Sequence, residues 1–243
     1  MLLSYHKTAC ASSSRSGFDP QNAFDESIKS AWSATSGNSG EWLSVDLGKE
    51  YNVEAVQVNF ADCFTKKKRA PMKEYGGTFT QERYIEEELV RYEYRIEYSS
   101  NGTDWAPYKE TQNTVFPHKL IPRRARARYI RIVFASAPYG QNFSISGLRV
   151  FGLDNNKKPS AVSGENAERT SATEARLSWN SQNDAMGYCI RLGIAPDKLY
   201  NSILLYGQND YTVTFLNKET EKYYFAVDSF NESGITKGST NEF

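Results

Sequence analysis

The sequence predicts an all-β protein made of two β-domains in tandem, the first an antiparallel sandwich or barrel and the second a small immunoglobulin-like sandwich. Apolar residues recur at every second position along most of the chain, and the helical period is almost absent. The alternating runs are short and end in Gly-, Asn- or Ser-containing turn signals. Aromatic residues, which are frequent in strands, make up 14% of the 243 residues.

The first half of the chain contains five alternating runs. They cover residues 43–47, 56–60, 92–98, 130–134 and 148–150. In the first run, Leu43, Val45 and Leu47 fall on one face of a strand because successive side chains point to opposite faces. Half-buried strands joined by turns favour an antiparallel sandwich or barrel.

A polar segment at 154–159, closed by Pro159, predicts a linker. It separates an expected first domain, residues 1–153, from a second at 160–243. The second region repeats the alternation at 175–179, 188–192, 211–215 and 223–229. This spacing fits one small immunoglobulin-like sandwich.

Charge and hydropathy argue against two classes of partner. The chain has 29 Lys and Arg against 29 Asp and Glu, so no net field attracts nucleic acid or an anionic membrane. Apolar runs are far shorter than the ~20 residues of a spanning helix, which excludes membrane insertion by this route. The basic stretch 123–128 leaves a sulfated or uronic-acid glycan open, beside the plainer interpretation of a solvated edge strand.

The first residues are too short and too soon polar for a signal peptide. We expect an interior fragment of an exported protein whose signal lies outside this sequence. Cys10, Cys63 and Cys189 form no C-x-x-C pair, so no zinc or redox site is suggested. A Cys10–Cys63 disulfide and two ordinary thiols both remain open.

The segment 61–91 is the longest connection, about 30 residues where about 4–6 is usual. It carries a basic run at 66–69 and an acidic run at 86–88, which could pair with each other. It is either a solvated insertion or one wall of a ligand site.

Five local patterns occur in order over residues 4–152. They are N-A-F-D at 22–25 followed by Trp32, W-L-S-V-D-L-G at 42–48, S-N-G-T-D-W at 100–105, R-Y-I-R-I at 128–132, and L-R-V-F-G at 148–152. Together they resemble discoidin domains, also called coagulation factor 5/8 type C domains, which include the family 32 carbohydrate-binding modules. The resemblance implies a jelly-roll sandwich and glycan recognition.

The second region resembles a fibronectin type III domain through Trp179 and the run from Tyr223 to Asn231 followed by Gly234. That resemblance implies that Tyr223 hydrogen-bonds the backbone at a sheet corner and has no ligand role. The pair of domains looks like the C-terminal accessory region of a secreted bacterial glycoside hydrolase, similar to family 43. It implies an upstream catalytic domain as partner and a secreted, periplasmic or cell-surface location.

A sugar ring has apolar faces and a rim of hydroxyls, so its binder needs an aromatic plate and hydrogen-bonding side chains. The resemblance places the binding loops at the end opposite the termini: 13–21, 33–40, 61 onward and 136–143. We expect Tyr139 to be the plate and Gln141 or Asn142 to meet hydroxyls. The other candidate contacts are Arg15, Phe18, Trp32, Asp62 and Phe64.

Three aromatic assignments stay open or favour the core. Trp32 is either core or the floor of the site, and Phe143 is either a ligand contact or a plug of the sandwich. Trp42 is expected in the core.

The resemblance also implies a structural calcium ion in the N-A-F-D loop. Asp25 and Ser30 match its ligands, whereas the second acidic position is Ser27 and the last-strand Glu is Gly147. Calcium prefers six to eight oxygens with carboxylates among them. We therefore expect no cofactor, with a weak calcium site as the alternative.

The sequence contains no Ser-centred nucleophile motif and no glycine-rich phosphate loop. We therefore expect no enzyme activity. The predicted function is a non-catalytic carbohydrate-binding module with a spacer domain that targets an attached glycoside hydrolase to glycan. The alternatives are a tail that packs on the catalytic domain without binding glycan, and a cell-surface adhesion discoidin domain.

Overall fold

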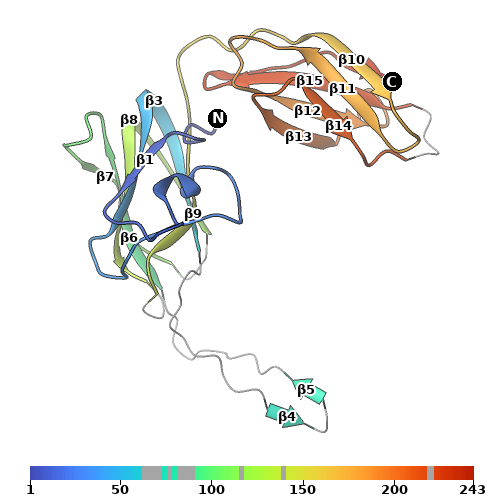
Figure 1. Cartoon of the computed structure of the whole chain (residues 1–243). Helices are drawn as coiled ribbons and strands as arrows, with labels where there is room; N and C mark the ends of the chain where they lie inside the picture. The colour runs from blue at the N-terminus through green and yellow to red at the C-terminus, as the bar shows by residue number, and fades with distance from the viewer. Residues whose placement is uncertain (62–72, 76–77, 81–90, 115–117, 138–140, 218–221) are drawn as a thin grey trace. The chain divides into compact units, whose positions relative to one another are not determined.

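The structure is a computed structural model that describes residues 1–61, 73–75, 78–80, 91–114, 118–137, 141–217 and 222–243 (Figure 1). The chain forms two compact units, Leu2–Gly152 and Leu153–Phe243. Apart from the short 3-10 helix η1, Pro20–Ala23, the elements of the described residues are strands. The all-β prediction is confirmed. No helix within the described residues is long and apolar enough to cross a membrane.

The first unit contains a sheet of seven strands. They are β1 (Thr8–Ala11), β2 (Trp32–Ser33), β3 (Trp42–Phe60), β6 (Tyr92–Ser99), β7 (Ala106–Thr114), β8 (His118–Ser136) and β9 (Ser144–Leu153). Their order is β2-β9-β3-β8-β6-β7, with β1 also paired to β3. Two further strands, β4 (Lys73–Tyr75) and β5 (Thr78–Thr80), pair with each other.

The long strands β3 and β8 each contribute to both layers of a jelly-roll sandwich. The first half of β3 pairs with β1 and with the end of β8, as in Leu43↔Ile132. Its second half pairs with the start of β8, as in Val56↔Ile121. The register shifts between these halves, where Gly48 adopts a φ of 90°, a conformation that glycine reaches without steric cost.

The core of the first unit follows the predicted alternation. Alternate residues of the strands are buried, among them Leu43, Val45, Val58, Ile96 and Ile132. Trp42 lies on the opposite face of β3 and is only half-buried. The prediction of Trp42 as core is therefore wrong, since a strand that buries Leu43 must turn its neighbour outward.

The arginines of the stretch 123–128 lie on the first part of β8, which pairs with β3, whereas β6 pairs with β8 only from Tyr129 to Ser136. Arg124, Arg126 and Arg128 face acids across the ladder. Their partners are Glu54 at 3.5 Å, Glu50 at 2.9 Å and Asp46 at 2.8 Å. The stretch is solvated, as the plainer interpretation expects, with the Arg124 and Arg126 side chains 86% and 71% exposed. The three ion pairs to β3 leave less positive charge for a polyanion.

The second unit packs two antiparallel sheets on a common core. Its strands are β10 (Ser163–Arg169), β11 (Ala175–Asn180), β12 (Gly187–Gly193), β13 (Asn201–Tyr206), β14 (Asp210–Val213), β15 (Tyr224–Asn231), β16 (Gly234–Thr236) and β17 (Asn241–Glu242). One sheet has the order β10-β11-β14, and the other β13-β12-β15-β16 with β17 on β15. The third predicted run, 211–215, ends early at Val213, and Phe215 is exposed.

Tyr223 is buried next to this core, and its hydroxyl accepts a hydrogen bond of 2.7 Å from the backbone N–H of Asn217. This confirms the predicted bond between the tyrosine and the backbone. Trp179 is also buried, and its ring contacts Tyr188 edge-on with centroids 5.3 Å apart.

Candidate functional site

Two of the loops expected to bind sugar are joined by backbone hydrogen bonds. The N–H of Arg15 donates to the carbonyl of Ser33 at 2.8 Å, and the N–H of Ser33 donates to the carbonyl of Phe18 at 3.2 Å. Two backbone hydrogen bonds, at Arg15 and Phe18, therefore hold the loop 13–21 to Ser33 at the start of the loop 33–40.

The loop 33–40 is joined in turn to the segment 136–143. The N–H of Ala34 donates to the carbonyl of Phe143 at 2.8 Å, and the N–H of Phe143 donates to the carbonyl of Ser36 at 3.3 Å. Gly37 lies so close that a Cβ there would sit 2.4 Å from the carbonyl oxygen of Gln141. Only glycine permits this approach without a backbone shift.

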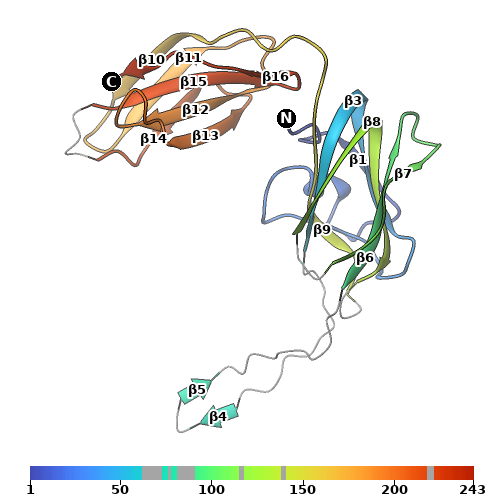
Figure 2. The same ribbon diagram turned by 180° about the vertical axis from the view of Figure 1, so that it is seen from behind.

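The described part of the fourth loop reaches the same end of the unit. The N–H of Ala61 donates to the carbonyl of Ser144 at 3.0 Å, where β9 begins. The bridge Leu2↔Phe151, where the chain enters and leaves this unit, lies at the other end of β9 (Figure 2). The four loops thus converge at the end opposite the chain termini of the first unit, as the resemblance implies.

At this end of the unit, Glu41 accepts hydrogen bonds from three serines, a cluster that the sequence did not predict. Its carboxylate accepts from the hydroxyls of Ser13 at 2.8 Å and Ser36 at 2.7 Å, and from that of Ser12. Burial alone would raise the pKa of Glu41, but the bonds from Ser12, Ser36 and Ser13 outweigh it and hold the pKa below its ordinary value. The three serines come from two loops, so one ionised carboxylate ties both to the start of β3.

Trp32 has 0% exposure and belongs to the core. Its indole N–H donates to the carbonyl of Ser13 at 3.1 Å and to the hydroxyl of Ser14 at 3.2 Å. Because no face of the ring reaches solvent, we withdraw Trp32 as a sugar contact and assign it to holding the loop 13–21. Phe143 is equally buried and stacks on Phe134 with centroids 4.3 Å apart, in agreement with the plug alternative.

Gln141 and Asn142 are 2% and 8% exposed. The amide of Gln141 donates to the hydroxyl of Tyr92 at 2.7 Å, and that of Asn142 donates to the carbonyl of Ala34 at 2.9 Å. Both side-chain amides are buried and hydrogen-bonded within the protein. The prediction that they bind sugar hydroxyls is therefore revised. In the structure, Gln141 and Asn142 instead anchor the end of the segment 136–143 to Tyr92 and Ala34.

Two of the other candidates lie on the surface of the loop 13–21, with Arg15 exposed and Phe18 half-buried. Tyr139, Asp62 and Phe64 lie outside the described residues, as does Cys63, the other half of the possible Cys10–Cys63 disulfide. The described cysteines, Cys10 and Cys189, are free thiols.

Residues 8–80 match the family model of the F5/8 type C domain. The match covers β1, β2 and β3 and the loops between them, the part of the first unit that contains Glu41 and Trp32. No curated protein sequence matches the chain.

Three solved structures of similar fold each match 62–63% of this chain over nearly their whole length. Chitosan-binding module 1 of a chitosanase/glucanase from Paenibacillus sp. IK-5 is 22% identical, with a TM-score of 0.48 over 63% of this chain and 99% of that module. A fucose-binding module of Streptococcus pneumoniae is 17% identical, with a TM-score of 0.43 over 63% and 95%. The CBM32 of AlyQ, solved with 4,5-unsaturated mannuronic acid, is 20% identical, with a TM-score of 0.44 over 62% and 98%.

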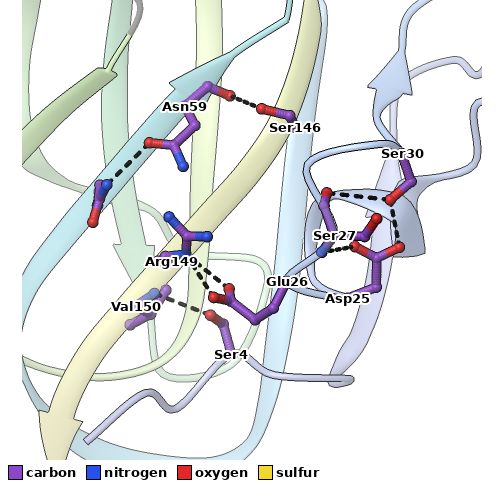
Figure 3. A network of polar contacts seen from close by, with 10 residues as sticks. Ser4, Asp25, Glu26, Ser27, Ser30, Asn59, Ser146, Arg149 and Val150 are labelled. Atoms are coloured by element: carbon purple, nitrogen blue, oxygen red, sulfur yellow. Dashed lines mark hydrogen bonds and ion pairs between the residues drawn. The ribbon is translucent and has the colours of Figure 1, made fainter. Parts of the chain in front are cut away.

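The polar side chains of the N-A-F-D loop are bonded within the loop and to β9. Asp25 and Ser30 are adjacent, but each Asp25 oxygen already accepts a hydrogen bond, from the Ser27 N–H at 2.8 Å and from the Ser30 hydroxyl at 2.6 Å. The neighbouring acid, Glu26, is paired with Arg149 (Figure 3). Among the described residues no group of three His, Cys, Asp or Glu side chains could hold a metal ion.

Proposed function

We propose that residues 1–153, which contain the first unit, form a non-catalytic carbohydrate-binding module whose sugar site lies where its four loops converge. The observation that carries the proposal is the cross-linking of these loops at one end of a rigid sandwich, through Glu41 and the backbone bonds around Ser33 and Ala34. Binding sites are commonly built on loops that a rigid scaffold positions.

The proposed contacts are Arg15 and Phe18, together with Tyr139, Asp62 and Phe64, which lie outside the described residues. Arg15 offers paired N–H donors for hydroxyls, and Phe18 and Tyr139 offer apolar rings. Asp62 and Phe64 follow directly after Ala61, which is fixed to β9. A single shallow site of this kind would bind one sugar with a Kd on the order of 10⁻⁴–10⁻³ M.

For the rest of the chain we propose a linker at 154–159 and a fibronectin type III spacer at 160–243. Two antiparallel sheets over one core and the Tyr223–Asn217 bond support it. We further propose that the fragment is attached to a secreted bacterial glycoside hydrolase. Such tethering would raise the local concentration of polysaccharide around the enzyme.

A glycan array probed with the whole chain tests the proposed function. We expect weak binding to a defined subset of neutral or acidic glycans. The variant Tyr139→Ala should lose this binding with an unchanged thermal midpoint. The matched control is Tyr200→Ala, which removes a tyrosine that is 80% exposed in the second unit and should bind like the wild type.

Silence across the array would contradict the proposal and favour a tail that packs on a catalytic domain. Binding to phospholipid vesicles without any glycan would favour the adhesion alternative. Glycan binding that survives Tyr139→Ala and is lost in Arg15→Ala would keep the function and move its centre to the loop 13–21.

A further inference from the structure

We infer that an arginine–glutamate ion pair fastens the 24–31 loop of the first unit in place of a metal ion. The loop connects η1 to β2 and carries Asp25 and Ser30, the two residues that match calcium ligands. The inference concerns how this loop is held, and it does not depend on the proposed sugar site.

The pair joins the loop to the last strand of the sandwich. The Nε of Arg149 on β9 lies 2.8 Å and 2.9 Å from the two carboxylate oxygens of Glu26 (Figure 3). The side chains of Arg149 and Glu26 are 22% and 31% exposed, so the pair is only partly shielded from water at the surface of the loop. Charge-assisted bonds are about twice as strong as neutral ones, and shielding from water limits their screening by salt.

The same guanidinium also reaches β3. With the side-chain amide of Asn59 turned so that its oxygen faces Arg149, the Nη1 of Arg149 donates to that oxygen at 2.7 Å. One arginine therefore links the loop, β9 and β3, which is the bridging task that a cation with several oxygen ligands performs in such a loop.

The backbone at Glu26 gives an independent indication. Glu26 has a φ of 60°, in the left-handed region that favours glycine or asparagine. A residue held in that conformation costs about 1–3 kcal/mol unless its surroundings fix it. The bond from its carboxylate to Arg149 gives a physical reason for a glutamate at this position.

Gly147, which stands where the resemblance implies a calcium-binding glutamate, also favours the ion pair over a metal ion. Gly147 lies two residues before Arg149 on β9, and a Cβ there would be 3.1 Å from the Asn59 amide. A glutamate at 147 would therefore crowd Asn59. Instead, the strand supplies a positive charge two residues later, and that charge disfavours a divalent cation beside Glu26.

The first test measures the thermal midpoint of the full chain with EDTA and with millimolar CaCl₂. We expect the same midpoint in both, and no saturable heat of calcium binding by calorimetry. A midpoint that rises with calcium, or a saturable calcium isotherm lost in Asp25→Asn, would overturn the inference. The comparison of midpoints with EDTA and with CaCl₂ uses the wild-type chain and needs no variant to fold.

The second test removes the pair. Arg149→Met and Glu26→Gln should each lower the midpoint of the first unit by about 2–6 °C, and the double variant should lower it by little more than one single variant. The control is Arg126→Met, which breaks a pair whose arginine side chain is 71% exposed. Because exposed ion pairs contribute little to stability, it should change the midpoint by less than roughly 1 °C. Unchanged midpoints in both single variants, or fully additive losses in the double variant, would overturn the inference.

Discussion

The guanidinium of Arg131 lies 4.0 Å from the ring centroid of Trp105, on the face of β8 that turns away from the core. The same group donates to the carboxylate of Glu97 on β6 through Nε at 2.8 Å and Nη2 at 2.5 Å. It also lies 5.9 Å from the ring of Trp42. One arginine thus holds together residues of β3, β6 and β8 and the turn after β6.

Replacing Arg131 by Met should destabilise the first unit by about 1–3 kcal/mol, because Glu97 loses a charged partner while it stays largely shielded. Chemical denaturation followed by tryptophan fluorescence measures the loss. Arg176→Met, which breaks an exposed pair with Asp210 in the second unit, is the control. Equal stability of the Arg131 variant and the wild type would show that the stacked arginine contributes nothing.

Glu41→Gln should loosen the loop end of the first unit. A glutamine has one acceptor oxygen where the carboxylate has two, so it cannot accept from Ser12, Ser13 and Ser36 as the wild-type side chain does. We expect a loss of about 1–2 kcal/mol in stability, together with faster amide hydrogen exchange at residues 13–15 and 34–37.

Glu110 is an exposed glutamate on β7 of the same unit and provides the matched control. Glu110→Gln should leave both stability and exchange unchanged. If Glu41→Gln exchanges like the wild type in both loops, the carboxylate is not what joins them.

The stability of the first unit should fall as the medium becomes acidic. Burial tends to raise the pKa of Glu41 and of Glu97, but their hydrogen bonds leave both pKa values lowered. The bond from Arg128 lowers the pKa of Asp46. A lowered folded-state pKa contributes stability above the unfolded value, about 4 for these acids, that is lost as the pH falls through the folded value.

Thermal midpoints measured from pH 7 to pH 3 check this expectation. The midpoint should be nearly constant down to about pH 5 and fall below about pH 4.5. In Glu41→Gln the fall should be shallower, because one of the three groups no longer titrates. A midpoint that rises between pH 5 and pH 3 would contradict the sign.

Tyr223→Phe should destabilise the second unit by about 0.5–1.5 kcal/mol, the usual worth of one hydrogen bond, since it removes the acceptor of the Asn217 N–H. Calorimetry that resolves the two units should show the loss in the second unit alone. Tyr200→Phe removes an exposed hydroxyl and is the control. A shift of the first unit's transition would mean that the two units do not unfold independently.

Much of the fold could be predicted from local patterns. The alternation in runs such as 43–47 and 92–98 places their apolar residues in the core, because a strand can bury only one face against one layer. The convergence of the loops 13–21, 33–40 and 136–143 followed from the family resemblance, which carries information about topology that the alternation lacks.

The candidate site was harder to predict because residue type does not reveal which way a side chain points. Trp32, Gln141 and Asn142 have the chemistry of sugar contacts, yet all three are turned inward to bond the loops. Glu41 gave no motif, since its three serine partners are far from it in sequence or follow no known spacing. Ser12 and Ser13 lie 29 and 28 residues before Glu41, so no local pattern in the sequence links them to it.

The sequence by itself determined the strands, their buried faces and the residues available for binding, since these depend on the period of the pattern and on side-chain chemistry. Only the tertiary structure decided the partners: Arg128 with Asp46, Arg149 with Glu26, and Glu41 with its serines. Such pairs join positions 82 and 123 residues apart, and their formation depends on strand register and on how the sheet folds over itself. Those are properties of the whole chain, because each ladder forms only once its partner strand is in place.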